Sequence, residues 1–277
     1  MRRSLALIAP AAVPTALVLG VSLTAVVGQS LGLAPVVGQA GLSGDAYRAA
    51  AATEGLGASL LLSLSIATAA TLLALVVGLA TALAVRATRL GGRILSGFAA
   101  LTIPVPHLVG AAAVGLLLSD SGLLARVTGG EGAWPQLVAG PWWAAVVLEF
   151  GWKESAFVAL VVVSVLASYA DQLDETAAVL GAGPLSRLRH ITLPLAAPAL
   201  VISGAVSFVY VLGSYEVAWL LGRAYPEPLP VLAYRLFTST DLSARPEAMA
   251  VAVLTVLLCA LVGAGSLTAL RRTMGPA

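Results

Sequence analysis

The sequence predicts an all-α integral membrane protein with six transmembrane helices. Hydrophobic residues make up 59% of its 277 residues and charged residues only 10%, whereas a soluble domain carries about 25% charged residues. Six apolar runs reach the ~20 residues that a helix needs to cross the hydrocarbon core. Because backbone groups in lipid must be satisfied internally, we predict that runs of this length form helices and not strands.

The six predicted spans share long apolar character and cover residues 5–28, 57–85, 94–118, 141–168, 195–221 and 248–270. The first follows Arg2 and Arg3, as a secretion signal would, but it is long for a signal core and no clear cleavage site follows. The single cysteine, Cys259, excludes an internal disulfide and is interpreted as a small packing residue.

The distribution of basic residues predicts the orientation. Nine arginines fall in one set of segments, close to span ends: Arg2, Arg3, Arg86, Arg89, Arg93, Arg187, Arg189, Arg271 and Arg272. Five fall in the opposite set: Arg48, Arg126, Arg223, Arg235 and Arg245. By the positive-inside rule both termini and the loop at about 169–193 are cytoplasmic, as an even number of spans requires.

The cytoplasmic segment between the fourth and fifth predicted spans has the pattern of a short amphipathic helix. Acids fill its first turn, which favours a helix N-terminus, and Leu173, Ala177 and Leu180 share one face. Gly181, Gly183 and Pro184 then end the helix. A short helix cannot bury an apolar stripe alone, so we predict that a partner protein covers it.

This segment resembles the cytoplasmic signature of permease subunits of binding-protein-dependent ABC importers, E-A-A-x3-G-x9-I-x-L-P. Glu175, Ala177 and Gly181 match its first part, and nine residues then lead to Ile191, Leu193 and Pro194. The one departure is Thr176, where the family usually has alanine. The motif is long and gapped, and it lies in the expected loop, which makes it far more specific than a short pattern.

The resemblance implies the type I ABC importer permease architecture, in the cytoplasmic membrane of a prokaryote. The predicted organisation is a transmembrane helix with an outer loop over 1–56, a core of five transmembrane helices over 57–270, and a cytoplasmic tail over 271–277. Implied partners are cytoplasmic ABC ATPase subunits, a second permease, an extracytoplasmic solute-binding protein and the lipid bilayer. The residues that the resemblance assigns to ATPase coupling are Glu175, Ala177, Ala178, Leu180, Gly181, Ile191, Leu193 and Pro194.

No catalytic constellation is visible in the sequence. His107 and His190 lack metal-ligand spacing, and no phosphate-binding glycine loop is present, so we predict no metal, no cofactor and ATP hydrolysis on a partner subunit. His107 follows Pro104 and Pro106 and is interpreted as a packed, hydrogen-bonded histidine. A net charge of +2 gives no indication of nucleic-acid binding.

Polar residues within the apolar spans are candidates for a solute path. A charge inside the bilayer costs about 2.5–3.5 kcal/mol on insertion scales; Glu149 and Lys153 lower that cost if they pair at i, i+4. Ser203, Ser207, Tyr210 and Ser214 form a polar stripe, although serines also bond to their own backbone. The candidates are Glu149, Ser207, Tyr210, Ser214, Tyr215 and Glu216. Glu216 alternatively pairs with Arg223.

Three functions are compatible with a polytopic protein. The signature favours an importer subunit. An ion-coupled secondary transporter would show internal symmetry, and an intramembrane enzyme would need a catalytic set that the sequence lacks.

The segment Gly213-Ser214-Tyr215-Glu216 resembles permeases for polyamines, ferric iron, sulfate and thiamine. Within that group we predict a spermidine/putrescine-type permease; the other solutes, or a sugar, are the alternative, because fold does not fix a ligand.

Overall fold

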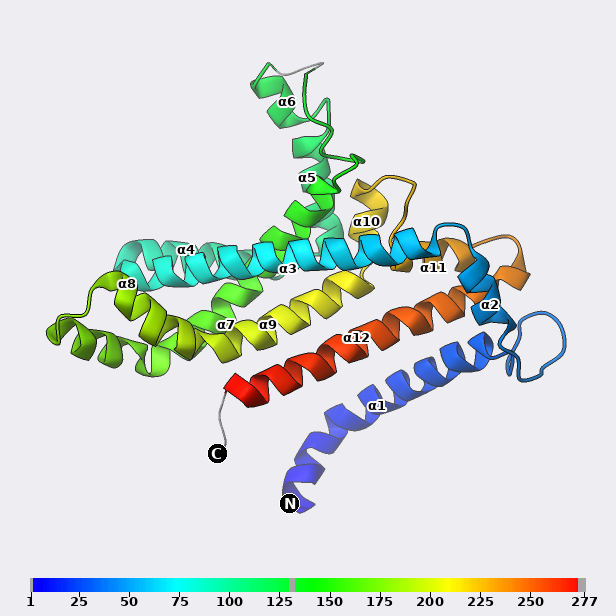
Figure 1. The fold of residues 1–277 in the computed structure, drawn as a ribbon, viewed down its shortest axis with the longest axis horizontal. Coiled ribbons are helices and arrows are strands. Elements are labelled where there is room, and N and C mark those ends of the chain that lie inside the picture. The colour runs from blue at the N-terminus through cyan, green and yellow to red at the C-terminus, as the bar shows by residue number, and fades with distance from the viewer. Residues whose placement is uncertain (1, 130–132, 274–277) are drawn as a thin grey trace. The chain divides into compact units, whose positions relative to one another are not determined.

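The computed structural model describes residues 2–129 and 133–273, and within them it contains helices and connecting turns but no β-strand. This confirms the all-α prediction (Figure 1). The helices in chain order are α1 (Arg2–Ser30), α2 (Asp45–Ala52), α3 (Leu56–Ala87), α4 (Arg89–Thr102), α5 (His107–Leu118), α6 (Leu123–Val127), α7 (Ala144–Val179), α8 (Pro184–Arg187), the π-helix η1 (Leu188–Thr192), α9 (Leu193–Gly213), α10 (Glu216–Leu221), α11 (Leu229–Phe237), the 3-10 helix η2 (Leu242–Ala244) and α12 (Arg245–Thr273).

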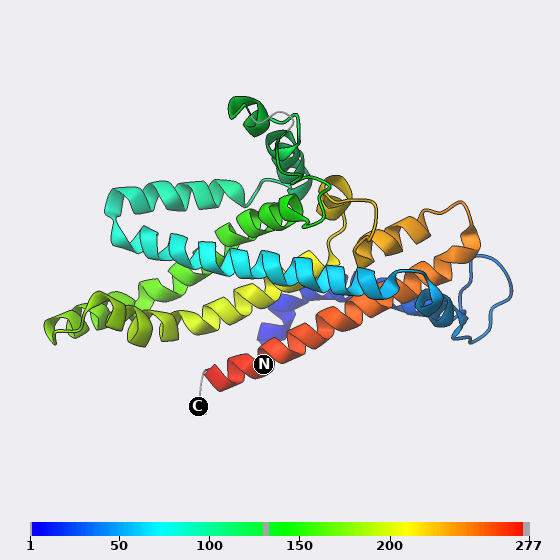
Figure 2. The same ribbon diagram turned by 45° about the horizontal axis from the view of Figure 1, so that its top comes forward.

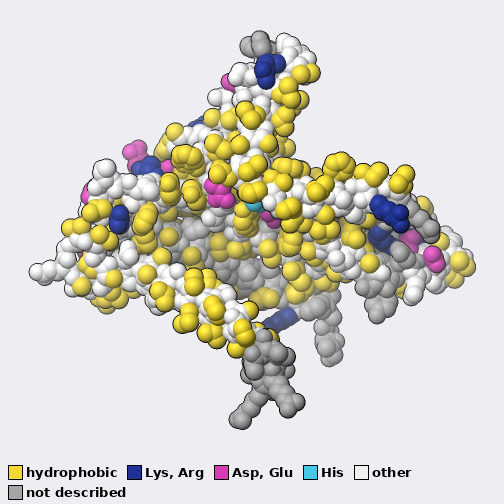
Figure 3. All heavy atoms as spheres, turned by 180° about the vertical axis from the view of Figure 1, so that it is seen from behind, with side chains coloured by type: hydrophobic (Ala, Val, Ile, Leu, Met, Phe, Trp, Pro, Cys, Tyr) yellow, Lys and Arg dark blue, Asp and Glu magenta, His cyan; other side chains and the backbone are white. Residues whose placement is uncertain are grey.

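Six helical stretches of the described chain are long and apolar enough to cross a membrane: Ile8–Ser30, Leu56–Ala87, His107–Val127, Ala144–Ala167, Pro184–Gly213 and Leu242–Arg271. Hydrophobic side chains spread over the face shown in Figure 3. In water such a surface would be an aggregation hazard, whereas lipid tails cover it at no cost. The predicted number of six spans is therefore confirmed.

The chain divides into two compact units. The first combines Met1–Leu60 with Pro228–Leu257. Within it the Ser30 and Tyr47 hydroxyls are 2.8 Å apart, which joins α1 to α2, and Thr53 donates a hydrogen bond to Glu247 at the start of α12. Polar contacts thus connect the helix ends of this unit.

The second unit combines Leu61–Glu227 with Leu258–Ala277 and is built around α3, α7 and α9. Its core consists of small and branched residues: Ala74, Ala82, Val158, Val162, Leu166, Ala196 and Ala199. A Cβ at Gly78 would lie 2.6 Å from the Val158 Cβ, so only glycine allows α3 to approach α7 this closely. Small residues at helix contacts are the expected packing device within membranes.

The third predicted span, 94–118, is not one helix. It divides into α4 and α5 at Ile103–Pro106, and the bend between the two helices is visible in Figure 2. Pro104 and Pro106 carry no N–H group and therefore interrupt the helical hydrogen bonds. The candidate span here is His107–Val127, which includes α5 and α6.

The fifth predicted span, 195–221, has other bounds in the structure, where the candidate span is Pro184–Gly213. The helix α9 ends at Gly213, Ser214 and Tyr215 form a turn, and Glu216 begins the separate short helix α10. Glu216 therefore lies on a different helix from Ser207 and Tyr210, which were predicted to share its span.

Candidate functional site

The loop that carries the importer signature begins within a long helix. The predicted short helix at 171–180 is not separate, because α7 continues without interruption from Ala144 to Val179. Good helix formers link the two parts, so no residue stops the helix before Gly181.

At Gly181 the chain makes a Schellman turn, which explains the glycine of the signature. The Ala182 N–H donates to the Ala177 carbonyl at 2.9 Å, and the Gly181 N–H donates to the Ala178 carbonyl at 3.0 Å. Gly181 has φ +86°, a conformation that costs other residues about 1–2 kcal/mol. Nothing lies within 4 Å of a Cβ built there, so backbone conformation is the intramolecular reason for glycine.

The second half of the signature lies where the chain returns. Arg187 on α8 donates to Asp174 on α7 at 2.7 Å, which closes the turn. Pro194 has no N–H group, and in the π-helix η1 just before it the Leu193 N–H bonds to the carbonyl of Leu188, five residues back. The fixed Ile-x-Leu-Pro spacing thus marks the junction of η1 with α9, and Ile191 and Leu193 are both half-buried there.

The tip of this hairpin exposes apolar side chains. Val179 is 88% exposed and Leu180 82% exposed, and Leu173 and Leu185 are exposed as well. Glu175 and Ala178 are exposed, and in the described part of the chain no ion pair engages Glu175. Five of the predicted coupling residues share one accessible hairpin, α7–α8, whose apolar tip is exposed in the described part of the chain: Glu175, Ala177, Ala178, Leu180 and Gly181. The other three, Ile191, Leu193 and Pro194, follow it in η1 and at the start of α9.

Besides the hairpin, a group of buried polar side chains lies inside the helix bundle of the second unit. Lys153 on α7 is 5% exposed, and its ammonium donates to the carbonyls of Thr102, at 2.7 Å, and Val105. Pro106 lacks the N–H group that would normally bond the Thr102 carbonyl. Lys153 therefore satisfies carbonyl groups at the α4–α5 break, and the predicted Glu149–Lys153 pair is not the arrangement found.

Two buried carboxylates flank His107, the first residue of α5. Its Nδ1 lies 3.2 Å from Glu149 Oε1, and its Nε2 lies 3.6 Å from Glu154 Oε1. Ser207 on α9 donates to Glu154 Oε2 at 2.6 Å. A neutral imidazole has one N–H and can donate to only one carboxylate, whereas an imidazolium donates to both. We call His107, Glu149, Lys153, Glu154 and Ser207 the polar cluster; it joins α5, α7 and α9.

The remaining candidates of the polar stripe differ in their surroundings. The Tyr210 ring packs 4.8 Å from that of His107, so Tyr210 borders the polar cluster. Ser203 is buried but bonds back to the Ala199 carbonyl of its own helix at 2.7 Å, the structural role that serines often have. Ser214 is buried at the end of α9.

Tyr215 and Glu216 follow the end of α9 and do not continue its stripe. The alternative partner for Glu216, Arg223, instead donates to the Tyr225 carbonyl at 2.5 Å. Sequence reasoning left His107, Lys153 and Glu154 out of the candidate site, although Pro104 and Pro106 signal orphaned carbonyls that require a donor.

Comparison with known proteins identifies the family. The model of the binding-protein-dependent transport system inner membrane component matches residues 74–276. The chain belongs to this family. As a member, this permease is a multi-pass protein of the inner membrane and a transport component, and the predicted importer-permease class is confirmed.

The names of two curated relatives contain different solutes. A protein of Salmonella typhimurium (strain LT2), provisionally named 2-aminoethylphosphonate transport system permease protein PhnV, is 30% identical over 203 residues, 73% of this chain and 69% of PhnV. The sulfoquinovosyl glycerol transport system permease protein SmoG of Agrobacterium fabrum is 34% identical over 83 residues, 30% of this chain and only 27% of SmoG. Neither name mentions a polyamine, so the spermidine/putrescine prediction is not confirmed.

Solved structures show the same fold. A chain of a bacterial ABC transporter that imports the acidic polysaccharide alginate aligns with a TM-score of 0.74 and 18% identity, covering 98% of this chain and 99% of that chain. A chain of the MetNI methionine ABC transporter aligns with a TM-score of 0.60 and 18% identity, covering 80% of this chain and 99% of that one. The predicted ABC importer permease architecture is confirmed at the level of fold.

Proposed function

We propose that this chain forms the solute pathway of an ABC importer together with a second permease and couples it to a separate cytoplasmic ATPase. The α7–α8 hairpin carries this proposal, because it presents the first part of the signature, up to Gly181, beside an apolar tip that is exposed in the described part of the chain. The Ile-x-Leu-Pro part follows at the junction of η1 with α9. In this proposal 57–270 is the permease core, 1–56 an additional helix with its loop, and 271–277 a tail, of which 274–277 lies outside the described residues. A solute-binding protein delivers the solute from outside.

The hairpin has the properties of a rigid docking element. Its helical half is continuous with the α7 span, its turn is fixed by the Gly181 conformation, and the Arg187–Asp174 ion pair ties the two halves together. A movement of the hairpin would therefore be transmitted along α7 to the polar cluster at Glu149, Lys153 and Glu154. Burial of Val179 and Leu180 by the ATPase would supply the binding energy, at about 1.5–3 kcal/mol for each fully buried side chain.

The test of coupling uses Gly181→Asp, with Glu175→Lys as the milder variant. We expect normal membrane insertion but loss of ATPase binding and uptake in Gly181→Asp, because φ +86° is strained for a side chain and the added charge lies beside the apolar tip. Gly129→Asp, at φ +68° outside the hairpin, is a matched control for backbone strain. Normal partner binding and uptake in Gly181→Asp would show that the hairpin is not the coupling element.

For the solute, we propose a small organophosphonate of the 2-aminoethylphosphonate kind in place of a polyamine. The support is the PhnV relative, whose similarity extends over 73% of this chain. The polar cluster, with Tyr210 at its border, is the proposed lining of the path, and Ser214, Tyr215 and Glu216 remain proposed members further along. An ammonium group suits Glu149 and Glu154, and a phosphonate suits Lys153 or protonated His107.

Uptake by the assembled importer tests the solute. We expect 2-aminoethylphosphonate to compete with the transported solute and spermidine to be inert. The variant Glu216→Gln tests whether the path extends beyond the polar cluster to Glu216. If Glu216 contacts the solute, the variant lowers uptake without affecting assembly of the importer. Competition by spermidine alone would reverse the solute assignment while leaving the coupling proposal intact.

A further inference from the structure

A cavity that is open to the surface and lined by basic and hydroxyl side chains lies at the turn between α3 and α4. Its volume is about 390 Å³, and its lining consists of Val85, Arg86, Thr88, Gly92, Arg93 and Ser96. That volume is within the range of small-molecule sites. Neither the proposed solute path nor the coupling hairpin uses these residues.

The chemistry of the lining selects an anion. Arg86 and Arg93 bring two guanidinium groups, which match the oxygens of a phosphate in geometry and charge. Thr88 and Ser96 add hydroxyl donors. Thr88 is also the N-cap of the 14-residue α4 and makes no side-chain capping bond, so the first-turn amides and the helix dipole of α4 add to the positive potential.

The location of the cavity selects a lipid as the source of that anion. The cavity adjoins Ala87, where the candidate span Leu56–Ala87 ends. At about 1.5 Å per residue this 32-residue helix is longer than the ~30 Å hydrocarbon core, so its end extends out of the core to the level of the headgroups. The arginine distribution assigns this end to the cytoplasmic leaflet, where juxtamembrane basic residues attract anionic lipids.

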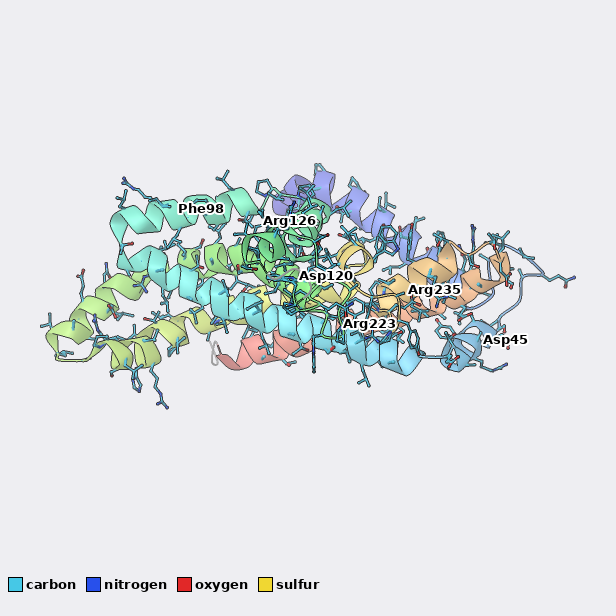
Figure 4. The ribbon with its side chains drawn as sticks, turned by 90° about the horizontal axis from the view of Figure 1, so that it is seen from above. Asp45, Phe98, Asp120, Arg126, Arg223 and Arg235 are labelled. Atoms are coloured by element: carbon cyan, nitrogen blue, oxygen red, sulfur yellow. The ribbon has the colours of Figure 1, made fainter. Side chains whose placement is uncertain are left out.

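A row of exposed apolar side chains on α4 runs away from the cavity. Leu90, Ile94 and Phe98 follow at steps of four residues, and all three are more than half exposed; Figure 4 labels Phe98 on α4. Leu90 precedes Arg93 by three residues, so the row neighbours Arg93 on the helix surface. A headgroup beside Arg93 would therefore place its acyl chains against this row.

We propose that the α3–α4 cavity binds the phosphate of an anionic phospholipid, whose acyl chains cover Leu90, Ile94 and Phe98. The proposal concerns the membrane environment of this permease and does not depend on which solute it carries. A specific lipid site differs from the general attraction of basic loops to the membrane. Lipid binding at a specific site depends on the uncharged cavity residue Ser96, whereas general electrostatic attraction does not.

Native mass spectrometry of the delipidated full-length chain in neutral detergent tests the proposal. The probes are dioleoylphosphatidylglycerol and, as the uncharged comparison, dioleoylphosphatidylcholine. We expect preferential binding of phosphatidylglycerol. Arg93→Gln should weaken that binding about five-fold, equivalent to about 1 kcal/mol for one interfacial arginine. Ser96→Leu, which fills the cavity without changing charge, should weaken it as well, and Arg93→Lys should retain most of it.

Arg126→Gln is the matched control, since Arg126 is an exposed arginine on α6 outside the cavity (Figure 4). Equal phosphatidylglycerol affinity in Arg93→Gln and Arg126→Gln would overturn the proposal. Displacement of the lipid by millimolar inorganic phosphate would also overturn it, because the site would then belong to free phosphate. Loss of ATPase binding in Arg93→Gln with unchanged lipid binding would assign the arginine to a protein contact instead.

Discussion

Replacing Lys153 with methionine removes a cation that two helices depend on. Lys153 is 5% exposed, and its ammonium donates to the Thr102 and Val105 carbonyls at the α4–α5 break. The ammonium also interacts electrostatically with Glu149 and Glu154. Side-chain hydrogen bonds within membrane proteins average about 0.6 kcal/mol and reach about 1.7 kcal/mol. The two bonds therefore account for about 1–3 kcal/mol.

Loss of the charge is the larger effect and includes those bonds, because Lys153 interacts electrostatically with both carboxylates, Glu149 and Glu154. Removing one member of a buried ion pair costs about 3–5 kcal/mol in soluble proteins. For Lys153→Met we expect the free energy of unfolding to fall by about 3 kcal/mol, roughly a hundred-fold in the unfolding equilibrium. Methionine keeps the chain length and its packing, so cavity formation contributes little.

Reversible unfolding in mixed micelles, followed by circular dichroism, measures this change. Ser155→Ala is the control, because Ser155 is buried on the same helix but bonds only to the Trp152 carbonyl of α7; we expect less than about 1 kcal/mol from it. The double variant with Glu149→Gln should recover at least about 1 kcal/mol, since it removes one uncompensated charge. A Lys153→Met loss no larger than that of Ser155→Ala, or strict additivity in the double variant, would refute the reasoning.

Three further predictions concern other parts of the chain. Ser207→Ala should lower the free energy of unfolding by about 1 kcal/mol more than Ser203→Ala in the same micelle assay, because Ser207 bonds across to Glu154 and Ser203 only to its own helix; equal losses would contradict the bridge. Gly78→Leu should abolish stable folding, judged by gel filtration in detergent, because a Cβ there already lies 2.6 Å from the Val158 Cβ. Gly97→Leu should be tolerated, because a Cβ at Gly97 has nothing within 4 Å. In a Cys259→Ser background, Ser186→Cys should resist an impermeant thiol reagent added to whole cells and react in inverted vesicles; labelling from outside would place the hairpin on the wrong side of the membrane.

Sequence periodicity was sufficient for the number of spans but not for where helices end. Apolar runs extend through Gly213 and through Pro104–Pro106, so hydropathy alone joins α9 to α10 and α4 to α5. At the hairpin the opposite error arises. The acidic turn at Asp171–Glu175 is typical of a helix start, yet α7 runs through it because no residue there stops a helix. Acidic residues are compatible with a helix start but do not require one, and α7 ends only where the backbone conformation changes at Gly181.

The polar cluster shows why the site was harder to predict than the fold. Glu149 and Lys153 satisfy the i, i+4 rule, and a single-helix analysis pairs them. In the bundle each has a partner outside its own helix: Lys153 donates to the Thr102 and Val105 carbonyls at the α4–α5 break, and Glu149 lies beside His107. Lys153 has these partners because the helical hydrogen bonds are interrupted between α4 and α5, and its ammonium on α7 donates to two carbonyls there. At Pro104-Val105-Pro106 the buried ammonium of Lys153 supplies donors to the interrupted backbone, and no pattern within α7 alone would reveal that role.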